Sequence, residues 1–458
     1  MIFSVKEIVK ITNGTLLQGD VNSQIQSVQI DSRSMDKASL FVPLKGERSD
    51  GHDYIFQAFE NGAVAVFSEK KLEYVDKSKS IILVENSLKA LQELAQQYIK
   101  HFDLEVIGVT GSVGKTSTKE MISYALSGEK KVFKTEKNFN SDIGLPLTIF
   151  KIDSTYDIAV LEMAVGEIGE LERTAKIARP HQAVMTNIGI SHIEKLKSQE
   201  NILKEKLHIT DYFDKESILF VNGDDPLLSG VSSQGKFRVV TFGLKEENDF
   251  FAYDITVCDM MTSFSVKLDD KEERFTIPVV GNHNVYNALA AIAVAWNNGI
   301  AIESVRKNIL GYKNQGMRQE IHKVGFTTII DDCYNASPDS MKSGINVLRA
   351  ISGDDESIAV LADMLELGEQ SVSAHEEVGR YVAENYINEL VTIGELGKII
   401  SDTAARISDK IKVKHFSSNE DVIAYLKSKL PKKRTVLVKA SRGMKLDEVV
   451  KALCKVSS

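Results

Sequence analysis

The amino-acid sequence predicts an α/β protein that is divided into three domains. Its 458 residues correspond to three units at the usual size of about 150 residues per domain. From Glu105 onward, apolar strands alternate with polar turns and amphipathic segments, a pattern typical of a doubly wound, mostly parallel sheet. A second alternation of this kind follows Met317. We therefore place domain boundaries near residues 100 and 315.

The first block, residues 1–100, predicts a small α/β unit. Short β-rich segments occur at Leu16–Leu17, Ile25–Ile30, Leu40–Pro43, Ala63–Phe67 and Ile81–Val84, and helical segments at Ile55–Asn61 and Leu88–His101. The strands are shorter than those that follow, so we expect a smaller sheet here.

The second block, residues 101–315, carries most of the predicted parallel sheet. Its apolar strands are VIGV at 106, VFK at 132, IAVL at 158, AVMTNI at 183, ILFVN at 218 and VVTFG at 239. A β-alternating stretch follows Asn248, and residues 284–297 predict a helix with Trp296 in the core. The third block, residues 316–458, predicts another α/β unit with strands TTIID, IAVLA, LVTIG, VKHF and TVLVKA.

Composition and charge exclude several classes of protein. The net charge of -8 argues against a dedicated nucleic-acid binder, whose domain pI usually exceeds about 9. The longest apolar stretch, Ala288–Trp296, is far shorter than the roughly 20 residues of a membrane-spanning helix. Lys6 and Lys10 interrupt the apolar start of the chain, and the cysteines are few and widely spaced, as in a reducing compartment. We expect a cytoplasmic monomer with no nucleic-acid partner and no membrane span.

The most informative segment is a glycine-rich turn between a strand and a helix, VIGVTGSVGKTSTKEM over residues 106–121. In such a loop the glycines let the backbone approach phosphates, and the helix N-terminus favours anions. The lysine reaches the β- and γ-phosphates, and the hydroxyl after it holds Mg²⁺. The nucleotide-binding candidates here are Thr110, Gly111, Ser112, Val113, Gly114, Lys115 and Thr116. Val109 stands where the standard pattern has its first glycine, so the loop is a variant.

Three further residues become candidates only in combination. Glu162 closes the strand IAVLE, where a carboxylate can reach Mg²⁺ beside the loop. His192 follows the strand at 183, and Lys206 lies in a helical segment. Each also has an ordinary explanation, as a solvated strand end, a hydrogen-bonded turn histidine and a surface lysine. The loop alone leaves kinases, motors and ligases open, whereas the absence of an Asn-Lys-x-Asp motif weakens the GTPase interpretation.

Several long segments together resemble the Mur ligase family of ATP-dependent, amide-forming enzymes. TGSVGKTSTKEM, TNIGISHIE, QENILKEK and GNHNVYNALAA are similar to its phosphate, metal and adenine segments. DDCYNASPDSM, LADMLELG and VLVKASRGMKLDEVV are similar to its D-alanyl-D-alanine-adding branch, and the DNPR sequence typical of the diamino-acid-adding branch is absent. The resemblance implies an N-terminal UDP-sugar-binding domain, a central P-loop ATPase domain and a C-terminal Rossmann-like domain.

The resemblance also implies a reaction and a metal site. ATP would phosphorylate the terminal carboxylate of UDP-MurNAc-tripeptide, and the amine of D-alanyl-D-alanine would attack the acyl phosphate. Beside the catalytic loop lysine, Thr116 and Glu162 would hold a first Mg²⁺. His192 would help to hold a second Mg²⁺. Lys206 matches the family's carbamylated lysine, an anionic oxygen ligand, with neighbouring Lys204 as the alternative.

Further residues are assigned to ATP and the substrates by the same resemblance. Asn284 and Asn287 would contact adenine, Arg318 the γ-phosphate, and Asp332, or alternatively Asp331, the ribose. The substrate-binding candidates are Ser32, Arg33, Lys45, Gly51 and His52 on the uridine side, Asn138 and Asn140 on the muramoyl-peptide side, and Tyr334, Asn335 and Ser337 on the dipeptide side. Turn chemistry explains Asn and Gly in such loops almost as well.

Three other functions compete with the dipeptide ligase. Another Mur-type or folyl-polyglutamate-like ligase would differ in its amino acceptor. A nucleotide-binding scaffold that has lost catalysis would bind ATP without turnover, although the loop, metal and lysine candidates are all present. A P-loop kinase explains only the central block. The third residue of the tripeptide is left open by the sequence.

Overall fold

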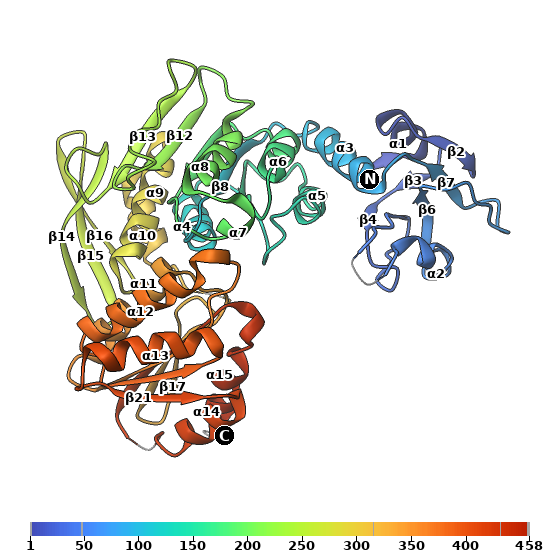
Figure 1. The fold of residues 1–458 in the computed structure, drawn as a ribbon. Coiled ribbons are helices and arrows are strands. Elements are labelled where there is room, and N and C mark those ends of the chain that lie inside the picture. The colour runs from blue at the N-terminus through green and yellow to red at the C-terminus, as the bar shows by residue number, and fades with distance from the viewer. Residues whose placement is uncertain (1, 47–48, 315, 431, 456–458) are drawn as a thin grey trace.

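The computed structural model describes residues 2–46, 49–314, 316–430 and 432–455. It confirms the predicted α/β class. Figure 1 shows the N-terminal part, in blue, reaching the central part through α3 (Ser87–Ile99), while the C-terminal part, in orange and red, lies against another side of the central part. Within the described residues, no helix has both the length and the apolar character needed to cross a lipid bilayer.

The N-terminal part is built on a five-stranded sheet. Its order is β2 (Thr15–Gln18), β7 (Ser80–Leu83), β6 (Ala63–Ser68), β5 (Ser39–Phe41) and β4 (Ser27–Gln29), with β1 (Phe3–Ser4) and β3 (Gln24–Ile25) paired separately. Helices α1 (Val5–Ile11) and α2 (Ile55–Glu60) complete this part. Helix α1 was not predicted; Ser4 and Glu7 form its capping box, which stabilises a short helix start.

The central part contains a nine-stranded sheet. Its order is β16 (Lys271–Ile277), β15 (Met261–Leu268), β14 (Phe250–Cys258), β13 (Arg238–Gly243), β12 (Ile218–Asn222), β11 (Gln182–Met185), β8 (Glu105–Thr110), β10 (Ile158–Glu162) and β9 (Val132–Lys134). Pairing is parallel from β9 to β14 and antiparallel for β15 and β16. The β-alternating stretch after Asn248 is thus a hairpin, because Asp259 and Met260 turn the chain with positive φ.

Seven α-helices of the described chain belong to the central part: α4 (Lys115–Leu126), α5 (Gly144–Ile149), α6 (Glu170–Ala178), α7 (Ile193–Leu196), α8 (Gln199–Leu207), α9 (Asn282–Asn297) and α10 (Ile302–Ile309). Helix α9 packs against α4, and its residues from Ala288 to Ala295 are fully buried. Trp296 is half-buried against the same core. This packing fixes the helix that follows the phosphate loop.

The C-terminal part contains a six-stranded sheet. Its order is β17 (Glu320–Val324), β18 (Thr327–Asp332), β22 (Arg434–Lys439), β19 (Glu356–Ala362), β20 (Glu389–Ile393) and β21 (Lys412–Phe416), and every pairing is parallel except that of β17 with β18. The helices are α11 (Pro338–Ser352), α12 (Ser371–Glu384), α13 (Glu395–Ile407), α14 (Asn419–Lys427) and α15 (Asp447–Cys454). Ligands of such sheets bind beyond the carboxyl ends of the strands.

Candidate active site

A cavity of about 1010 Å³ is lined by residues of both the central and the C-terminal parts. Its size is at the upper end of small-molecule sites, which reach about 1,000 Å³. The predicted residues that line it are Ser112, Val113, Gly114, Lys115, Thr116, Asn138, Asn140, Glu162, His192, Asn284, Asn287, Arg318, Asp332, Tyr334, Asn335 and Ser337. The fold therefore gathers into one site residues that are spread over 225 positions of sequence, from 112 to 337.

The phosphate loop follows β8 and is braced by the end of β11. Gly111 has a φ of +145°, and a Cβ there would lie 1.9 Å from Thr186 Oγ1. Thr186 Oγ1 donates to the Val113 carbonyl at 2.6 Å, and Asn187 Oδ1 accepts from the Val113 N–H at 2.9 Å. The Ser112 N–H donates to the Asn187 carbonyl at 3.0 Å. Only glycine fits at 111, because backbone and neighbour both exclude a side chain.

Lys115 begins helix α4 and lies over the loop. Its Nζ donates to the carbonyls of Gly111 at 2.8 Å and Ser112 at 3.2 Å. Burial lowers the pKa of the Lys115 amine, while Glu162 opposes that shift. The amine is therefore held next to the loop. A bound phosphate would give it charged oxygen partners in place of the Gly111 and Ser112 carbonyls.

Glu162, at the end of β10, is 2 % exposed and joins three elements. Its Oε2 accepts from Thr116 Oγ1 at 2.8 Å and its Oε1 from Asn140 Nδ2 at 2.7 Å. Lys119 Nζ lies 3.9 Å from Oε2. A carboxylate and a hydroxyl thus meet beside the phosphate loop.

Lys206 is buried, whereas Lys204 is exposed. Lys206 Nζ donates to the Gly111 carbonyl at 3.1 Å. Burial, and secondarily the charge of Lys115, holds the pKa of the Lys206 amine well below its ordinary value. The structure therefore places Lys206, and not its neighbour, against the phosphate loop. Thr110 Oγ1, at the end of β8, is buried without a hydrogen-bond partner among the described residues.

His192 reaches the C-terminal part. It has a φ of +60°, and its Nδ1 lies 2.5 Å from Glu366 Oε2. Burial, followed by the charge of Lys115, lowers the pKa of the imidazole, and Glu366 opposes this. The segment that carries His192 is thus tied to the loop after β19.

Asn284 and Asn287 lie in the first turns of α9 but are already engaged. Asn287 Oδ1 accepts from Thr118 Oγ1 at 2.9 Å, and Asn287 Nδ2 donates to Asn284 Oδ1 at 3.3 Å. Asn284 Nδ2 donates to the Val280 carbonyl at 2.9 Å. These amides connect α9 to α4 in addition to lining the cavity.

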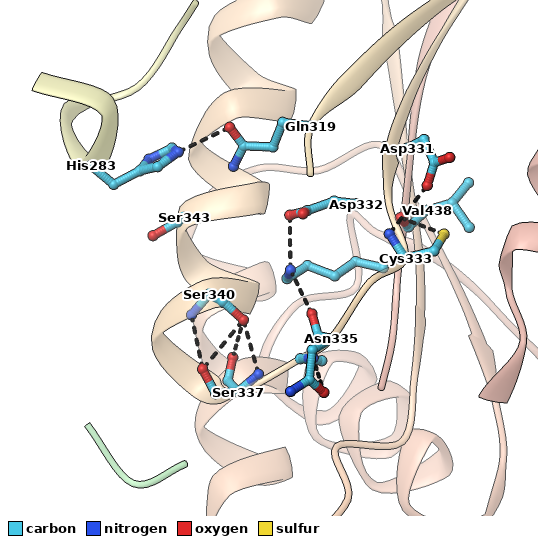
Figure 2. Close-up of polar contacts among 12 residues, drawn as sticks. His283, Gln319, Asp331, Asp332, Cys333, Asn335, Ser337, Ser340, Ser343 and Val438 are labelled. Atoms are coloured by element: carbon cyan, nitrogen blue, oxygen red, sulfur yellow. Dashed lines mark hydrogen bonds and ion pairs between the residues drawn. The ribbon is translucent and has the colours of Figure 1, made fainter. Parts of the chain in front are cut away.

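Arg318 and Tyr334 face each other at the cavity. The guanidinium carbon of Arg318 lies 3.8 Å from the centre of the Tyr334 ring. Ser337 caps α11 through Ser340 (Figure 2), so its side chain has a structural role at the helix start. The dipeptide-side candidates therefore lie between the end of β18 and the first turn of α11.

Asp332 and Asp331 point to different surroundings (Figure 2). Asp332 lines the cavity and pairs with Lys439 Nζ at 2.8 Å. Lys439 Nζ also donates to the Asn335 carbonyl at 3.1 Å. Asp331 Oδ1 instead accepts from the Cys333 N–H at 3.2 Å. Of the two carboxylates, only that of Asp332 belongs to a residue that lines the cavity.

The uridine-side candidates do not line this cavity; they are Ser32, Arg33, Lys45, Gly51 and His52. Arg33 is exposed and pairs with Asp31 at 2.8 Å. His52 Nδ1 lies 2.7 Å from Asp50 Oδ1, and its buried Nε2 has no hydrogen-bond partner among the described residues. All five lie in the N-terminal part, outside the cavity.

Sequence reasoning missed several residues of the site, notably Thr186, Asn187, His283 and Gln319. The first two precede His192 in the segment TNIGISHIE, so the polar pair after a buried strand was a signal. His283 Nε2 contacts Gln319 Oε1 at 2.9 Å (Figure 2). Gln319 has no sequence signal, because its role depends on a contact between residues 36 positions apart.

The fold and the site together define a P-loop nucleotide-binding protein with a second α/β domain over the loop. Family models match three stretches of the chain: the Mur ligase family catalytic domain at residues 24–99, the Mur ligase middle domain at 109–295 and the Mur ligase glutamate ligase domain at 317–442. The chain belongs to the Mur ligase family.

Individual relatives match over almost the whole chain. A Bacillus subtilis protein named UDP-N-acetylmuramoyl-tripeptide–D-alanyl-D-alanine ligase is 40% identical, over 98% of each chain. A crystal structure of MurF from Acinetobacter baumannii has a TM-score of 0.90, with 26% identity and 99% of each chain covered. MurF from Thermotoga maritima in complex with ADP has a TM-score of 0.84 and 30% identity, and the match covers 94% of this chain and 97% of that one.

Proposed function

We propose that this chain is an ADP-forming ligase that joins D-alanyl-D-alanine to UDP-MurNAc-tripeptide, giving UDP-MurNAc-pentapeptide for peptidoglycan synthesis. The observation that carries the proposal is the shared cavity. Its lining joins the phosphate-loop residue Lys115 to Tyr334 and Asn335, in the segment that resembles the dipeptide-adding branch. The name of the Bacillus subtilis relative supports the same acceptor.

The chemistry requires two steps at one carboxylate. A carboxylate oxygen of the tripeptide bonds to the γ-phosphorus as the bond to ADP breaks. The dipeptide amine then attacks the carbonyl carbon, phosphate leaves and the amine loses a proton. Lys115 and Arg318 supply positive charge for the phosphates. Closure of the C-terminal domain over the cavity would exclude water, which would otherwise hydrolyse the acyl phosphate.

The side chains of Thr116 and Glu162 fit a magnesium ion. Mg²⁺ prefers oxygen ligands, typically one or two from the protein and the rest from phosphates and water, and Thr116 Oγ1 and Glu162 Oε2 lie 2.8 Å apart. We propose that these two hold the ion, which would neutralise phosphate charge when bound. His192 is our candidate for a second ion.

Lys206 is our candidate for carbamylation. Burial lowers the pKa of the Lys206 amine and so favours its neutral form, which can attack CO₂, forming an N–C bond and losing one proton. Its burial and the contact with the Gly111 carbonyl supply that environment. Lys206→Ala is expected to lose activity and to regain part of it with acetate. A wild-type rate without acetate would contradict this role.

The remaining assignments follow from position. We propose that Asn284 and Asn287 contact adenine, Asp332 the ribose, and Asn335 and Ser337, which follow Tyr334, the dipeptide. The muramoyl-peptide would contact Asn138 and Asn140, and its uridine end would contact the N-terminal candidates Ser32, Arg33, Lys45, Gly51 and His52. We further propose a cytoplasmic monomer, because ATP is available in the cytoplasm and one chain supplies both sides of the cavity.

The test is ATP-dependent phosphate release with UDP-MurNAc-tripeptide fixed and the amine varied among D-alanyl-D-alanine, D-alanine, L-lysine and diaminopimelate. Mass spectrometry follows the product. Pentapeptide formed only with D-alanyl-D-alanine is expected. Product with another amine would indicate a sibling ligase, and ATP binding without any product would indicate a scaffold.

A further inference from the structure

The segment that joins the central and C-terminal parts has an unusual backbone around Arg318. Gly316, Met317 and Gln319 have φ values of +68°, +59° and +55°. Left-handed backbone is unfavourable for residues with a side chain, so it persists only where surrounding contacts hold it. The two residues that flank Arg318 are both of this kind.

Contacts from both parts hold this segment. On the C-terminal side, the Tyr334 N–H donates to the Met317 carbonyl at 3.2 Å. On the central side, Gln319 Oε1 is 2.9 Å from His283 Nε2 (Figure 2). Gln319 is 9 % exposed, so its amide is removed from competing water. Contacts at Met317 and Gln319 therefore hold the backbone on both sides of Arg318, which fixes the position from which its side chain extends.

The guanidinium of Arg318 lacks a carboxylate partner. No ion pair joins it to an acid within the described residues, and its one hydrogen bond is a long contact of 3.4 Å to the Gly316 carbonyl. Its main support is the Tyr334 ring, 3.8 Å away. A ring face attracts the cation without consuming its N–H donors. The donors are left for an anion in the cavity.

We propose that Tyr334 is a positioning residue, whose ring seats the Arg318 guanidinium for the γ-phosphate of ATP. The ring performs this role and not the hydroxyl, which makes no hydrogen bond within the described residues. This inference rests on the proposed function. It differs from a dipeptide-binding role for Tyr334, because it acts through Arg318 on the nucleotide.

Tyr334→Leu and Tyr334→Phe separate the ring from the hydroxyl. Tyr334→Leu is expected to lower kcat by about 2- to 30-fold, the range of a cation–π contact, with little change in KM for D-alanyl-D-alanine. Tyr334→Phe is expected to rescue most of that loss. Tyr334→Met is a second apolar replacement, and circular dichroism checks that each variant is folded. Equal losses in the Phe and Leu variants, or a raised dipeptide KM alone, would overturn the proposal.

A matched control is available elsewhere in the central part. Arg179 lies 4.8 Å from the centre of the Tyr212 ring, and neither residue lines the cavity. Tyr212→Leu therefore removes a similar stack away from the site and is expected to leave kcat unchanged. A loss of kcat in Tyr212→Leu as large as that in Tyr334→Leu would mean that removing such a stack lowers activity only by destabilising the fold, and would contradict the proposal.

A double-mutant cycle tests whether Tyr334 acts through Arg318. In an Arg318→Leu background, Tyr334→Leu is expected to add no further loss; additive losses would contradict the proposal. Calorimetry with ADP and with the β,γ-imido analogue of ATP gives a readout that needs no turnover. Tyr334→Leu is expected to weaken the analogue relative to ADP, and equal weakening would contradict it. If the wild type forms no pentapeptide, the proposed function fails, and this binding comparison still decides the role of Tyr334.

Discussion

His192 Nδ1 lies 2.5 Å from Glu366 Oε2, so a close polar contact joins the loop after β11 to the loop after β19. Both residues have left-handed backbone, with φ of +60° and +64°. The pair connects the central part to the C-terminal part, and its His192 lines the cavity. Because Glu366 is 59 % exposed, the pair is accessible to water and can open.

Glu366→Ala should loosen this connection with little effect on stability. Even a fully charged pair at an exposed position contributes only about 0–1 kcal/mol to the free energy of unfolding, so the free energy of unfolding measured in urea should change by less than about 1 kcal/mol. Small-angle scattering should show a larger mean radius of gyration without nucleotide. Glu369→Ala, in the exposed 3-10 helix Gly368–Gln370 that follows, is the control; an equal expansion there would count against a specific role of the pair.

Gly111→Ala should disable the phosphate loop. The new Cβ would lie 1.9 Å from Thr186 Oγ1 on a backbone with φ of +145°. We expect at least about a tenfold loss of ATP affinity, equal to 1.4 kcal/mol. Gly235→Ala is the matched control, because Gly235 also has positive φ, +82°, but a Cβ there meets nothing within 4 Å. Unchanged nucleotide binding by Gly111→Ala in calorimetry would contradict the described loop.

Glu162→Gln should raise the magnesium requirement. The amide keeps the size of the side chain that Thr116 and Asn140 contact but removes the charge that attracts a cation. We expect roughly a 100-fold lower rate at limiting Mg²⁺, as for loss of several kcal/mol of metal stabilisation, and partial recovery at high Mg²⁺. Glu129→Gln, at an exposed turn, should behave as wild type. A Glu162→Gln variant with the wild-type magnesium profile would argue against this ligand.

His375 should make the C-terminal part sensitive to acid. Its Nε2 accepts from the Met364 N–H at 2.9 Å, and burial lowers the pKa of the imidazole below its ordinary value. Below about pH 6.5 the unfolded chain therefore binds a proton that the folded chain does not. The contribution of the neutral His375 imidazole to the free energy of unfolding is therefore complete above that pH. It falls on acidification, by up to about 1.4 kcal/mol per pH unit.

The measurement is the free energy of unfolding in urea between pH 5 and 8, for the wild type and for the His375→Gln variant. Glutamine can still accept from the Met364 N–H but does not titrate, so the acid loss should become smaller. His101→Gln, at an exposed position, should leave the pH profile as it is. An unchanged slope in His375→Gln would show that the acid sensitivity comes from other groups.

Much of the fold could be predicted because its signals are local. The apolar strands from Val106 to Val239 stand out because both faces of a parallel sheet are buried. The phosphate loop depends on glycines and a lysine within a few positions, and its Gly111, with positive φ, has the predicted place after β8. Helix α1 was missed, since seven residues carry too weak a period.

The sequence by itself determined the α/β class, the phosphate loop and, through the resemblance, the Mur ligase family. The tertiary structure decided which of two neighbouring candidates belongs to the site: Lys206 is buried against the Gly111 carbonyl of the phosphate loop while Lys204 is exposed, and Asp332 lines the cavity while Asp331 bonds to the following backbone. Residues one or two apart leave a helix or strand in different directions, so only the packing of the elements selects between them. The contact of the Arg318 guanidinium with the Tyr334 ring likewise joins two separate segments, so no local sequence pattern predicts it.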